Sequence, residues 1–335
     1  MSLGVAIVGA GLIGRKRAAA LQKLHGSELK AVVDVNRTAA EALSRDFGGR
    51  VLARWQDALD ADEVGIVVVS TTNRFLAEIS TAALTAGKHV LCEKPLGRNA
   101  TESALILNAV KRSGKLLKTG FNHRLHPALA RARELHQQGR IGELMYLRCR
   151  YGHGGRPGYE REWRASKELC GGGEMLDQGV HVVDLFRWFA GDFSEAVGFV
   201  PTCFWDMEVE DNAFALFRTD RGVTASMHTS WTQWKNLFSF EVFGKDGYLI
   251  VEGLGGSYGV ETLRIGHRRP EGGAPEEQSV VFEGPDTSWE SEWLEFLQAI
   301  AEARCPVGDA WDGHQANRMI EAVYRSAEQG SVVAI

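Results

Sequence analysis

Short apolar runs alternate with longer amphipathic stretches along the first 120 residues of the chain. Apolar runs with the pattern of buried strands occur at residues 5–8, 29–33, 51–53, 65–69, 89–92 and 116–119. Stretches with helical periodicity lie between them, at residues 12–24, 74–86 and 101–112, and a capping-box sequence at 38–41 predicts one more helix start. Alternation of this kind predicts an α/β Rossmann fold with a doubly wound parallel sheet.

The pattern changes after about residue 120 and predicts a second domain. Helices are expected at residues 127–138, 174–189, 289–303 and 314–328. Strands are expected at residues 144–151, 213–217, 223–231, 238–243, 248–251 and 279–282. Hairpin-like spacing predicts a C-terminal α+β domain with a mostly antiparallel sheet. We therefore divide the chain into domains 1–122 and 123–335.

A glycine-rich turn follows the first strand directly. Gly9, Gly11 and Gly14 form the pattern GxGxxG, with Leu12 and Ile13 opening the next helix. Glycines at these positions make the turn and let the backbone approach a pyrophosphate, while the helix N-terminus offers unpaired N–H groups to the phosphates. The pattern alone is a weak signal, but its place between a strand and a helix predicts a dinucleotide site.

An acidic residue supports the same site. Asp34 ends the second strand, 20 residues after Gly14, where its carboxylate can accept hydrogen bonds from both ribose hydroxyls. The same charge would repel a 2′-phosphate, so NAD is favoured over NADP. Arg37 lies close by and keeps NADP open as an alternative.

Two further strand ends should face the cofactor, because ligands of an open parallel sheet bind at the carboxyl ends of its strands. The fourth strand is followed by Thr71, Thr72 and Asn73, and the fifth by Glu93 and Lys94. Lys94 precedes a proline, which restricts its backbone and can aim its ammonium into the crevice.

The segment at residues 170–181 carries the second candidate group. Three glycines precede a predicted helix and would allow a ligand to approach closely, and Asp177 and His181 are four residues apart on one helix face. The carboxylate can orient the imidazole, which can then take a proton from a substrate hydroxyl. A surface ion pair is the plain alternative. A metal site made of Glu174, Asp177 and His181 lacks a supporting His or Cys cluster, so no metal is expected.

The amino-acid composition argues against a nucleic-acid-binding protein and a membrane protein. Lys and Arg number 38 against 43 Asp and Glu, a net charge of −5, which favours neither nucleic acid nor an anionic membrane. The longest apolar run outside the N-terminus, residues 64–69, is far short of the ~20 residues that span a bilayer. Five scattered cysteines without a CxxC pair suit a reducing cytosol, so a cytoplasmic location is expected.

Taken together, these motifs resemble the glucose-fructose oxidoreductase, inositol dehydrogenase and rhizopine-catabolism family (Gfo/Idh/MocA), over nearly the whole chain. The resemblance also includes the segments 120–124, 241–244 and 247–248. It implies an NAD(P)-binding first domain, a sugar or cyclitol bound between the domains, and an open sheet that often serves as an oligomer interface, here in a dimer or tetramer.

The resemblance implies roles for individual residues. The catalytic set of the family corresponds to Lys94, Asp177 and His181, and Asn122 is expected at the cofactor. Two positions depart from the family pattern, because Thr72 and Leu76 stand where the family usually has Pro and His.

An arginine-rich segment at residues 124–164 supplies candidate substrate contacts. Trp163 can stack on a sugar face, Arg164 can bind hydroxyls or a phosphate, and Arg124 is a further candidate. The acidic stretch 206–211 is read as an exposed loop, with an amine-bearing substrate as the alternative.

The expected enzyme is an NAD-dependent dehydrogenase that oxidises a secondary hydroxyl of a sugar, amino sugar or cyclitol. Lys94 and His181 would act on the same hydroxyl oxygen, with Asp177 holding the imidazole. Two alternatives remain open: a glycoside hydrolase that retains its NAD, and a non-catalytic NAD(P) sensor. The first would accumulate no NADH, and the second would have no use for the three catalytic residues together.

Overall fold

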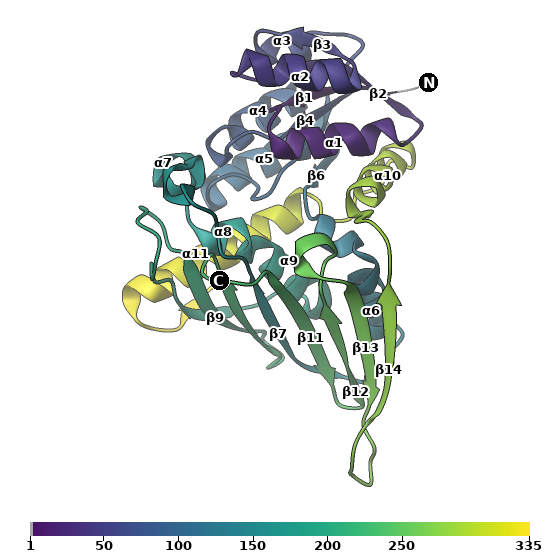
Figure 1. Ribbon diagram of the computed structural model, residues 1–335, viewed down its shortest axis with the longest axis vertical. Coiled ribbons are helices and arrows are strands. Elements are labelled where there is room, and N and C mark those ends of the chain that lie inside the picture. The colour runs from purple at the N-terminus through teal and green to yellow at the C-terminus, as the bar shows by residue number, and fades with distance from the viewer. Residues whose placement is uncertain (1–2) are drawn as a thin grey trace. The chain divides into compact units, whose positions relative to one another are not determined.

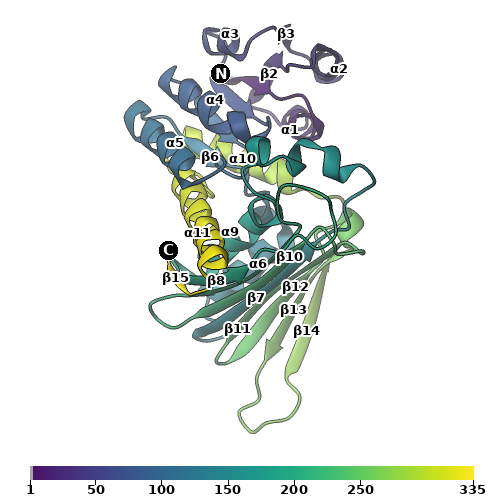
Figure 2. The ribbon, with the colours of Figure 1, turned by 90° about the vertical axis from the view of Figure 1, so that its left-hand side faces the viewer.

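The computed structural model describes residues 3–335, which divide into two compact units. The first unit comprises the residues up to Asn122 together with Glu168–Gly171 and Ser288–Asn317. The second comprises His123–Lys167, Gly172–Thr287 and Arg318–Ile335. Figures 1 and 2 give the element labels used below.

The first unit is built on a parallel sheet of six strands among the described residues, in the order β3-β2-β1-β4-β5-β6. The strands are β1 (Leu3–Val8), β2 (Ser27–Val33), β3 (Arg50–Leu52), β4 (Ile66–Val69), β5 (His89–Cys92) and β6 (Leu117–Thr119). The helices between them are α1 (Leu12–Gln22), α2 (Arg37–Phe47), α3 (Trp55–Leu59), α4 (Asn73–Thr85) and α5 (Ala100–Ser113). This confirms the predicted doubly wound sheet; only the short helix α3 is additional.

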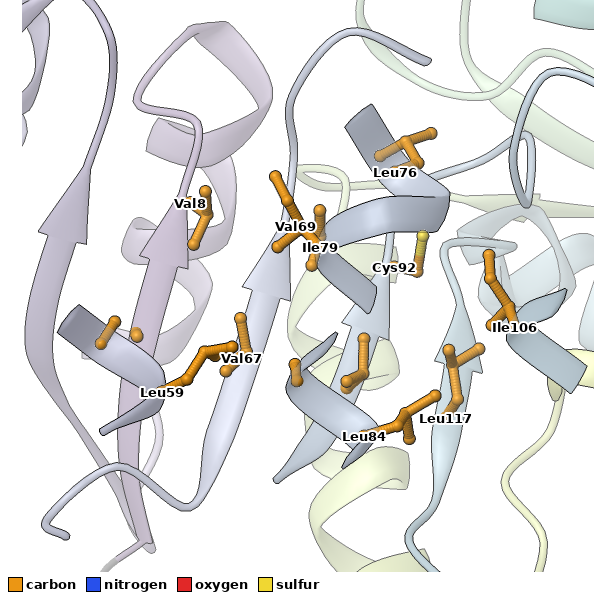
Figure 3. Packing of buried hydrophobic residues seen from close by; sticks show 14 of the residues in the cluster. Val8, Leu59, Val67, Val69, Leu76, Ile79, Leu84, Cys92, Ile106 and Leu117 are labelled. Atoms are coloured by element: carbon orange, nitrogen blue, oxygen red, sulfur yellow. The ribbon is translucent and has the colours of Figure 1, made fainter. Parts of the chain in front are cut away.

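Apolar side chains cover both faces of this sheet. Alternate residues of β4 point to opposite faces, so Ile66 and Val68 join one buried cluster while Val67 and Val69 join the other. Figure 3 shows the second cluster, in which side chains of β1, β4, β5 and β6 meet those of the helices. Burial on both faces explains why the strands read as continuous apolar runs.

A late segment completes the first unit. Helix α10 (Ser288–Ala301) places Trp293 and Phe296 in the same buried cluster as Val5 and Ile7. The sequence division at residue 122 assigns this helix to the second domain, because linear order does not reveal which sheet an apolar helix face packs on. The following helix is α11 (Ala310–Gln329).

The second unit is built on a mixed sheet of nine strands among the described residues, in the order β14-β13-β12-β11-β7-β10-β9-β8-β15. The strands are β7 (Leu144–Gly152), β8 (Glu195–Phe199), β9 (Asn212–Arg218), β10 (Thr224–Ser230), β11 (Leu237–Gly244), β12 (Gly247–Glu252), β13 (Glu261–His267), β14 (Glu276–Phe282) and β15 (Val333–Ala334). Strands β7 and β10 pair in parallel and the other pairs are antiparallel. The predicted mostly antiparallel sheet is therefore confirmed.

Helices cover one face of the second sheet, as Figure 2 shows for α6 (Pro127–Gln137) and α9 (Gly179–Ala190). On β9 the buried and exposed side chains alternate, with Ala213, Ala215 and Phe217 buried. The short helices of this region are η1 (Asn122–Leu125), η2 (Tyr159–Arg161), η3 (Trp163–Ala165), α7 (Lys167–Cys170), α8 (Glu174–Asp177) and η4 (Gly256–Tyr258).

The sequence analysis missed three strands of this unit and misjudged one helix. Strands β8 and β13 were not predicted, since each is interrupted by a glycine, Gly198 or Gly266. Strand β15 has only two residues and was also not predicted. The single helix predicted over 174–189 is two helices, α8 and α9, separated at Gln178. There the N–H of His181 donates to the carbonyl of Gln178 at 3.0 Å, a tighter turn than an α-helix makes.

Candidate active site

In the turn after β1, two of the three glycines are required because backbone atoms of the protein pack directly against them. Gly9 has a φ of +103°, and a Cβ there would overlap the Ser70 carbonyl. A Cβ on Gly14 would overlap the Gly9 carbonyl. Gly11 differs, because a Cβ on it would meet no atom within 4 Å. The open side of the turn therefore lies at Gly11, where a phosphate can reach the backbone at the start of α1.

Asp34 ties the end of β2 to this turn. Its carboxylate accepts hydrogen bonds from the backbone N–H of Ala10 at 2.6 Å and of Asn36 at 2.7 Å. An ionised carboxylate offers about four acceptor sites, so it retains capacity for hydroxyl donors. Arg37 is exposed and forms an ion pair with Glu41, one helical turn away. The turn and Asp34 together fit the phosphates and a ribose of a dinucleotide.

The residues after β4 have separate tasks. Thr71 donates its hydroxyl to the Thr72 carbonyl at 3.1 Å, and Thr72 is the N-cap of α4. The Thr72 hydroxyl oxygen is buried without a hydrogen-bond partner among the described residues. Asn73 donates its amide to the Cys170 carbonyl at 2.8 Å, which ties α4 to the segment Glu168–Gly171 of the same unit.

Glu93 lies in a buried charge cluster. Arg17 donates to Glu93 at 2.7 Å and also pairs with Glu292. Burial raises the pKa of Glu292 even though the Arg17 charge opposes that rise. The pKa of Arg17 is raised because the two carboxylates outweigh the effect of burial. The structure thus gives Glu93 a scaffold role, and the predicted contact with cofactor stays a prediction.

The other residues predicted to bind the cofactor in this unit are Lys94, Asn122, Leu12 and Ile13. Lys94, half-buried, directly follows Glu93 at the end of β5. Asn122 is buried and donates its amide to the Ser288 hydroxyl at 2.9 Å. Leu12 is exposed and Ile13 half-buried in the first turn of α1.

In the second unit, Asp177 meets Arg164, one of the residues predicted to bind substrate. Its carboxylate lies 3.4 Å from the guanidinium of Arg164, which in turn lies 4.5 Å from the centre of the Trp163 ring. Burial lowers the pKa of Arg164, but the acidic groups around it, Asp177 first among them, together outweigh burial, so the pKa is raised and the cation is retained. Asp177, Arg164 and Trp163 therefore form one group. The sequence alone could not show that these residues lie together.

His181 is buried and stacks on a second imidazole. Its ring centre lies 3.8 Å from that of His123, with the planes 23° apart, and His123 also contacts Tyr151 at 5.4 Å. Sequence reasoning did not single out His123, although it lies within the segment 120–124 that supports the family resemblance. The stacked ring of His123 therefore fixes the plane in which the His181 imidazole lies.

The charge of Asp177 also acts on two tyrosines, Tyr159 and Tyr258. Burial raises the pKa of Tyr258 to about 12, and Gln178 donates its side-chain amide to the Tyr258 hydroxyl at 3.0 Å. Burial and the charge of Asp177 raise the pKa of Tyr159 as well. Both hydroxyls therefore keep their protons at neutral pH. Neither tyrosine was predicted, because each comes from a loop remote in sequence from Asp177.

The interpretation of the three glycines at 171–173 was wrong. A Cβ on Gly171, Gly172 or Gly173 would overlap Arg98, Tyr324 or the Glu210 carbonyl, respectively, so protein groups occupy the space expected for a ligand. Glu210 accepts hydrogen bonds from the N–H groups of Gly173 and Met175, each at 3.1 Å. The carboxylate thus caps the start of α8.

The acidic stretch 206–211 is the expected exposed loop only in its first half, where Asp206 and Glu208 are exposed. Glu210 and Asp211 are buried, and Asp211 accepts from the N–H groups of Cys203, Phe204 and Trp205. These carboxylates hold the backbone, which a run of acidic letters does not reveal.

Arg124 forms a buried, bidentate ion pair with Asp184 of α9, with N···O distances of 2.8 and 2.5 Å. This pair fixes η1 against α9. The substrate contact expected of Arg124 stays a prediction.

Within residues 3–335, no group of three or more His, Cys, Asp or Glu side chains is placed to hold a metal ion. None of the helices described there is long and apolar enough to cross a membrane.

Family models match most of the chain. Residues 3–121 match the oxidoreductase family with an NAD-binding Rossmann fold, and residues 129–250 match the GFO/IDH/MocA C-terminal domain. The chain belongs to the Gfo/Idh/MocA oxidoreductase family. Its first unit is thus an NAD-binding Rossmann domain, in agreement with the predicted dinucleotide turn.

Curated Gfo/Idh/MocA relatives align over the full chain. A levoglucosan dehydrogenase of Pseudarthrobacter phenanthrenivorans is 24% identical, covering 100% of this chain and 98% of the relative. A 1,5-anhydro-D-fructose reductase of Ensifer adhaerens is 29% identical, covering 98% and 97%. A D-glucoside 3-dehydrogenase of Escherichia coli is 27% identical, covering 99% and 97%.

Solved structures agree on the fold. Levoglucosan dehydrogenase in complex with NADH superposes with a TM-score of 0.92 at 24% identity, covering 100% of this chain and 99% of that one. An oxidoreductase domain protein from Kribbella flavida gives a TM-score of 0.91 at 25% identity, with the same coverage.

Proposed function

We propose that this Gfo/Idh/MocA protein is an NAD-dependent dehydrogenase that oxidises a secondary hydroxyl of a sugar, amino sugar or cyclitol to a ketone, reversibly. The observation that carries the proposal is the glycine turn clamped by Asp34 in a chain of this oxidoreductase family. The curated relatives, which are named as sugar dehydrogenases and reductases, support the substrate class.

Each catalytic residue has a stated task in this proposal. His181 takes the hydroxyl proton, and Lys94 donates a hydrogen bond to the same oxygen and stabilises its developing negative charge. Asp177 stabilises the charged imidazole, while the carbon loses a hydride. Bound NAD⁺ would supply the acceptor for that hydride, held at Gly9–Gly14 and Asp34. Loss of the proton and the hydride converts the secondary alcohol to a ketone.

The contacts within the second unit support a substrate role for Trp163 and Arg164. Arg164 lies between the Trp163 ring and the Asp177 carboxylate, and its retained charge offers N–H donors to sugar hydroxyls. The indole face of Trp163 can pack on the C–H face of a sugar ring. Arg124 remains a proposed substrate contact.

A panel of sugars, amino sugars, inositols and nucleotide sugars, assayed for NADH formation, tests the function. The proposal expects at least one compound to give NADH and ketone in equal amounts. Cleavage of a glycoside with no NADH would instead favour the hydrolase. Tight NAD binding without turnover on any compound would favour the sensor.

We propose further that the enzyme prefers NAD to NADP. Asp34 would repel a 2′-phosphate, and Arg37 is paired with Glu41. The variant Asp34→Ser should lose about tenfold in kcat/KM with NAD and gain activity with NADP, as expected for the loss of a charged hydrogen bond. Equal use of both cofactors by the wild type would contradict the preference.

A second copy of the chain is the proposed partner for the uncovered face of the second sheet. Exposed apolar side chains lie on its strands β8 and β9, namely Phe199, Phe214 and Leu216. Light scattering should give the mass of a dimer or tetramer, and Phe199→Asp should lower it. We propose a cytoplasmic location, since the cysteines among residues 3–335 form no disulfide; cell fractionation tests this.

A further inference from the structure

Three aromatic side chains form an exposed group on loops next to the second sheet. We call Phe204, Trp205 and Trp234 the aromatic platform. Phe204 is 61% exposed and Trp234 68%, and their rings meet edge to face at 4.9 Å. Phe204 and Trp205 meet in the same way at 5.2 Å. Exposed aromatic side chains in mutual contact often mark a binding surface.

The platform is held rigidly by its surroundings. The buried carboxylate of Asp211 accepts from the N–H groups of Phe204 and Trp205 at 2.8 and 2.9 Å. The Trp205 indole donates to the Trp231 carbonyl at 2.9 Å. A Cβ on Gly155 would meet the Trp205 ring, so that loop packs directly on it. A surface that is already ordered loses little entropy when a ligand binds.

One side chain connects the platform to the catalytic group. Tyr159 packs against Trp205 with ring centres 5.8 Å apart, and it lies close enough to Asp177 to feel its charge. The backbone joins the same parts, since the Glu208 N–H donates to the Ala165 carbonyl at 3.2 Å, next to Arg164. The buried Tyr159 and this backbone hydrogen bond therefore join the platform to the segment that carries Arg164, whose guanidinium pairs with Asp177.

We propose that the aromatic platform is a subsite for a second ring of the substrate, so that the enzyme prefers glycosides to the corresponding free monosaccharides. The inference rests on the proposed function: the sugar to be oxidised lies at Asp177 and His181, and its sugar or aryl substituent lies on Phe204 and Trp234. Aromatic faces pack well on the apolar face of such a ring. Three side chains are too small a surface for a stable protein partner, which buries about 800 Å² on each side.

The test compares two derivatives of the panel sugar with the highest kcat/KM, its methyl and phenyl glycosides (for a cyclitol, the corresponding ethers). Wild type should favour the phenyl compound by about tenfold in kcat/KM, a typical gain from apolar contact. Trp234→Ala and Phe204→Ala should bring this ratio close to one and leave the methyl rate unchanged, while Trp234→Phe keeps the preference. Phe214→Ala, an exposed aromatic on β9 outside the platform, is the matched control and should leave the phenyl-to-methyl ratio unchanged.

Equal rates of the wild type on both compounds, or an unchanged ratio in both alanine variants, would overturn the subsite. An unchanged ratio together with a lower oligomer mass in Trp234→Ala would assign the platform to contacts between copies, which also overturns it. If no sugar of the panel is oxidised, the proposed function itself fails, which is a different result.

Discussion

The two units bury their sheets in different ways. The parallel sheet of the first unit has apolar clusters on both faces, whereas the second sheet has helices over one face and alternates buried with exposed side chains along β9. A strand buried on both faces must be apolar throughout, so its sequence identifies it. A strand buried on one face needs an apolar residue only at every second position, and short strands of this kind are easily missed.

Buried charge sharpens this comparison. In the first unit Arg17 is enclosed with two carboxylates, those of Glu93 and Glu292. In the second unit Arg124 is enclosed with one, that of Asp184. Each arginine joins segments that are far apart in the chain. Its charged hydrogen bonds fix the geometry of these segments more precisely than an apolar contact would.

Removal of Arg17 should have the largest effect on stability. Arg17→Met strands two buried carboxylates and should lower the free energy of unfolding by about 3–5 kcal/mol. Arg124→Met strands one and should cost about 3 kcal/mol, the lower end of that range. Urea denaturation measures both. Partial recovery of stability on adding Glu292→Gln to Arg17→Met serves as the control, because Glu93 still lacks Arg17, and a loss below about 1 kcal/mol for Arg17→Met would contradict the cluster's role.

Two glycine substitutions compare the units at smaller cost. Gly173→Ala in the second unit forces a Cβ onto the Glu210 carbonyl and should cost about 1–3 kcal/mol in stability. Gly11→Ala in the first unit meets open space and should leave stability unchanged. It should instead weaken NAD binding, which calorimetry measures, because the methyl group lies where the backbone meets the phosphates. The reverse pattern would show that Gly173 and not Gly11 faces a ligand.

The fold and the site differed in how far the sequence could predict them. The glycine turn and Asp34 were predictable because their chemistry lies within one strand–helix–strand unit. The contacts of Asp177 with Arg164, and of His181 with His123, join segments that are far apart in the chain, so spacing alone could not reveal them. The glycines at 171–173 misled, because close approach by protein and by ligand leaves the same sequence pattern.

The smallest expected effect concerns acid stability in the second unit. Burial, with help from the Arg133 charge, lowers the pKa of His136. The neutral form therefore stabilises the folded state above the unfolded pKa of about 6.5, and this contribution is lost as pH falls toward the folded pKa. Thermal unfolding between pH 7 and pH 5 should show a slightly shallower decline for His136→Gln than for wild type. Parallel declines would rule out this contribution.

The central proposal is that Lys94 and His181 act on one hydroxyl oxygen. The direct measurement is kcat for Lys94→Ala, His181→Ala and the double variant, with NAD affinity measured alongside. Each single change should lower kcat by at least about 100-fold, and the double variant should be little worse than the worse single, because the residues work on the same step. NAD affinity should not change. Near-wild-type kcat in either single variant, or losses that multiply in the double variant, would contradict the claim.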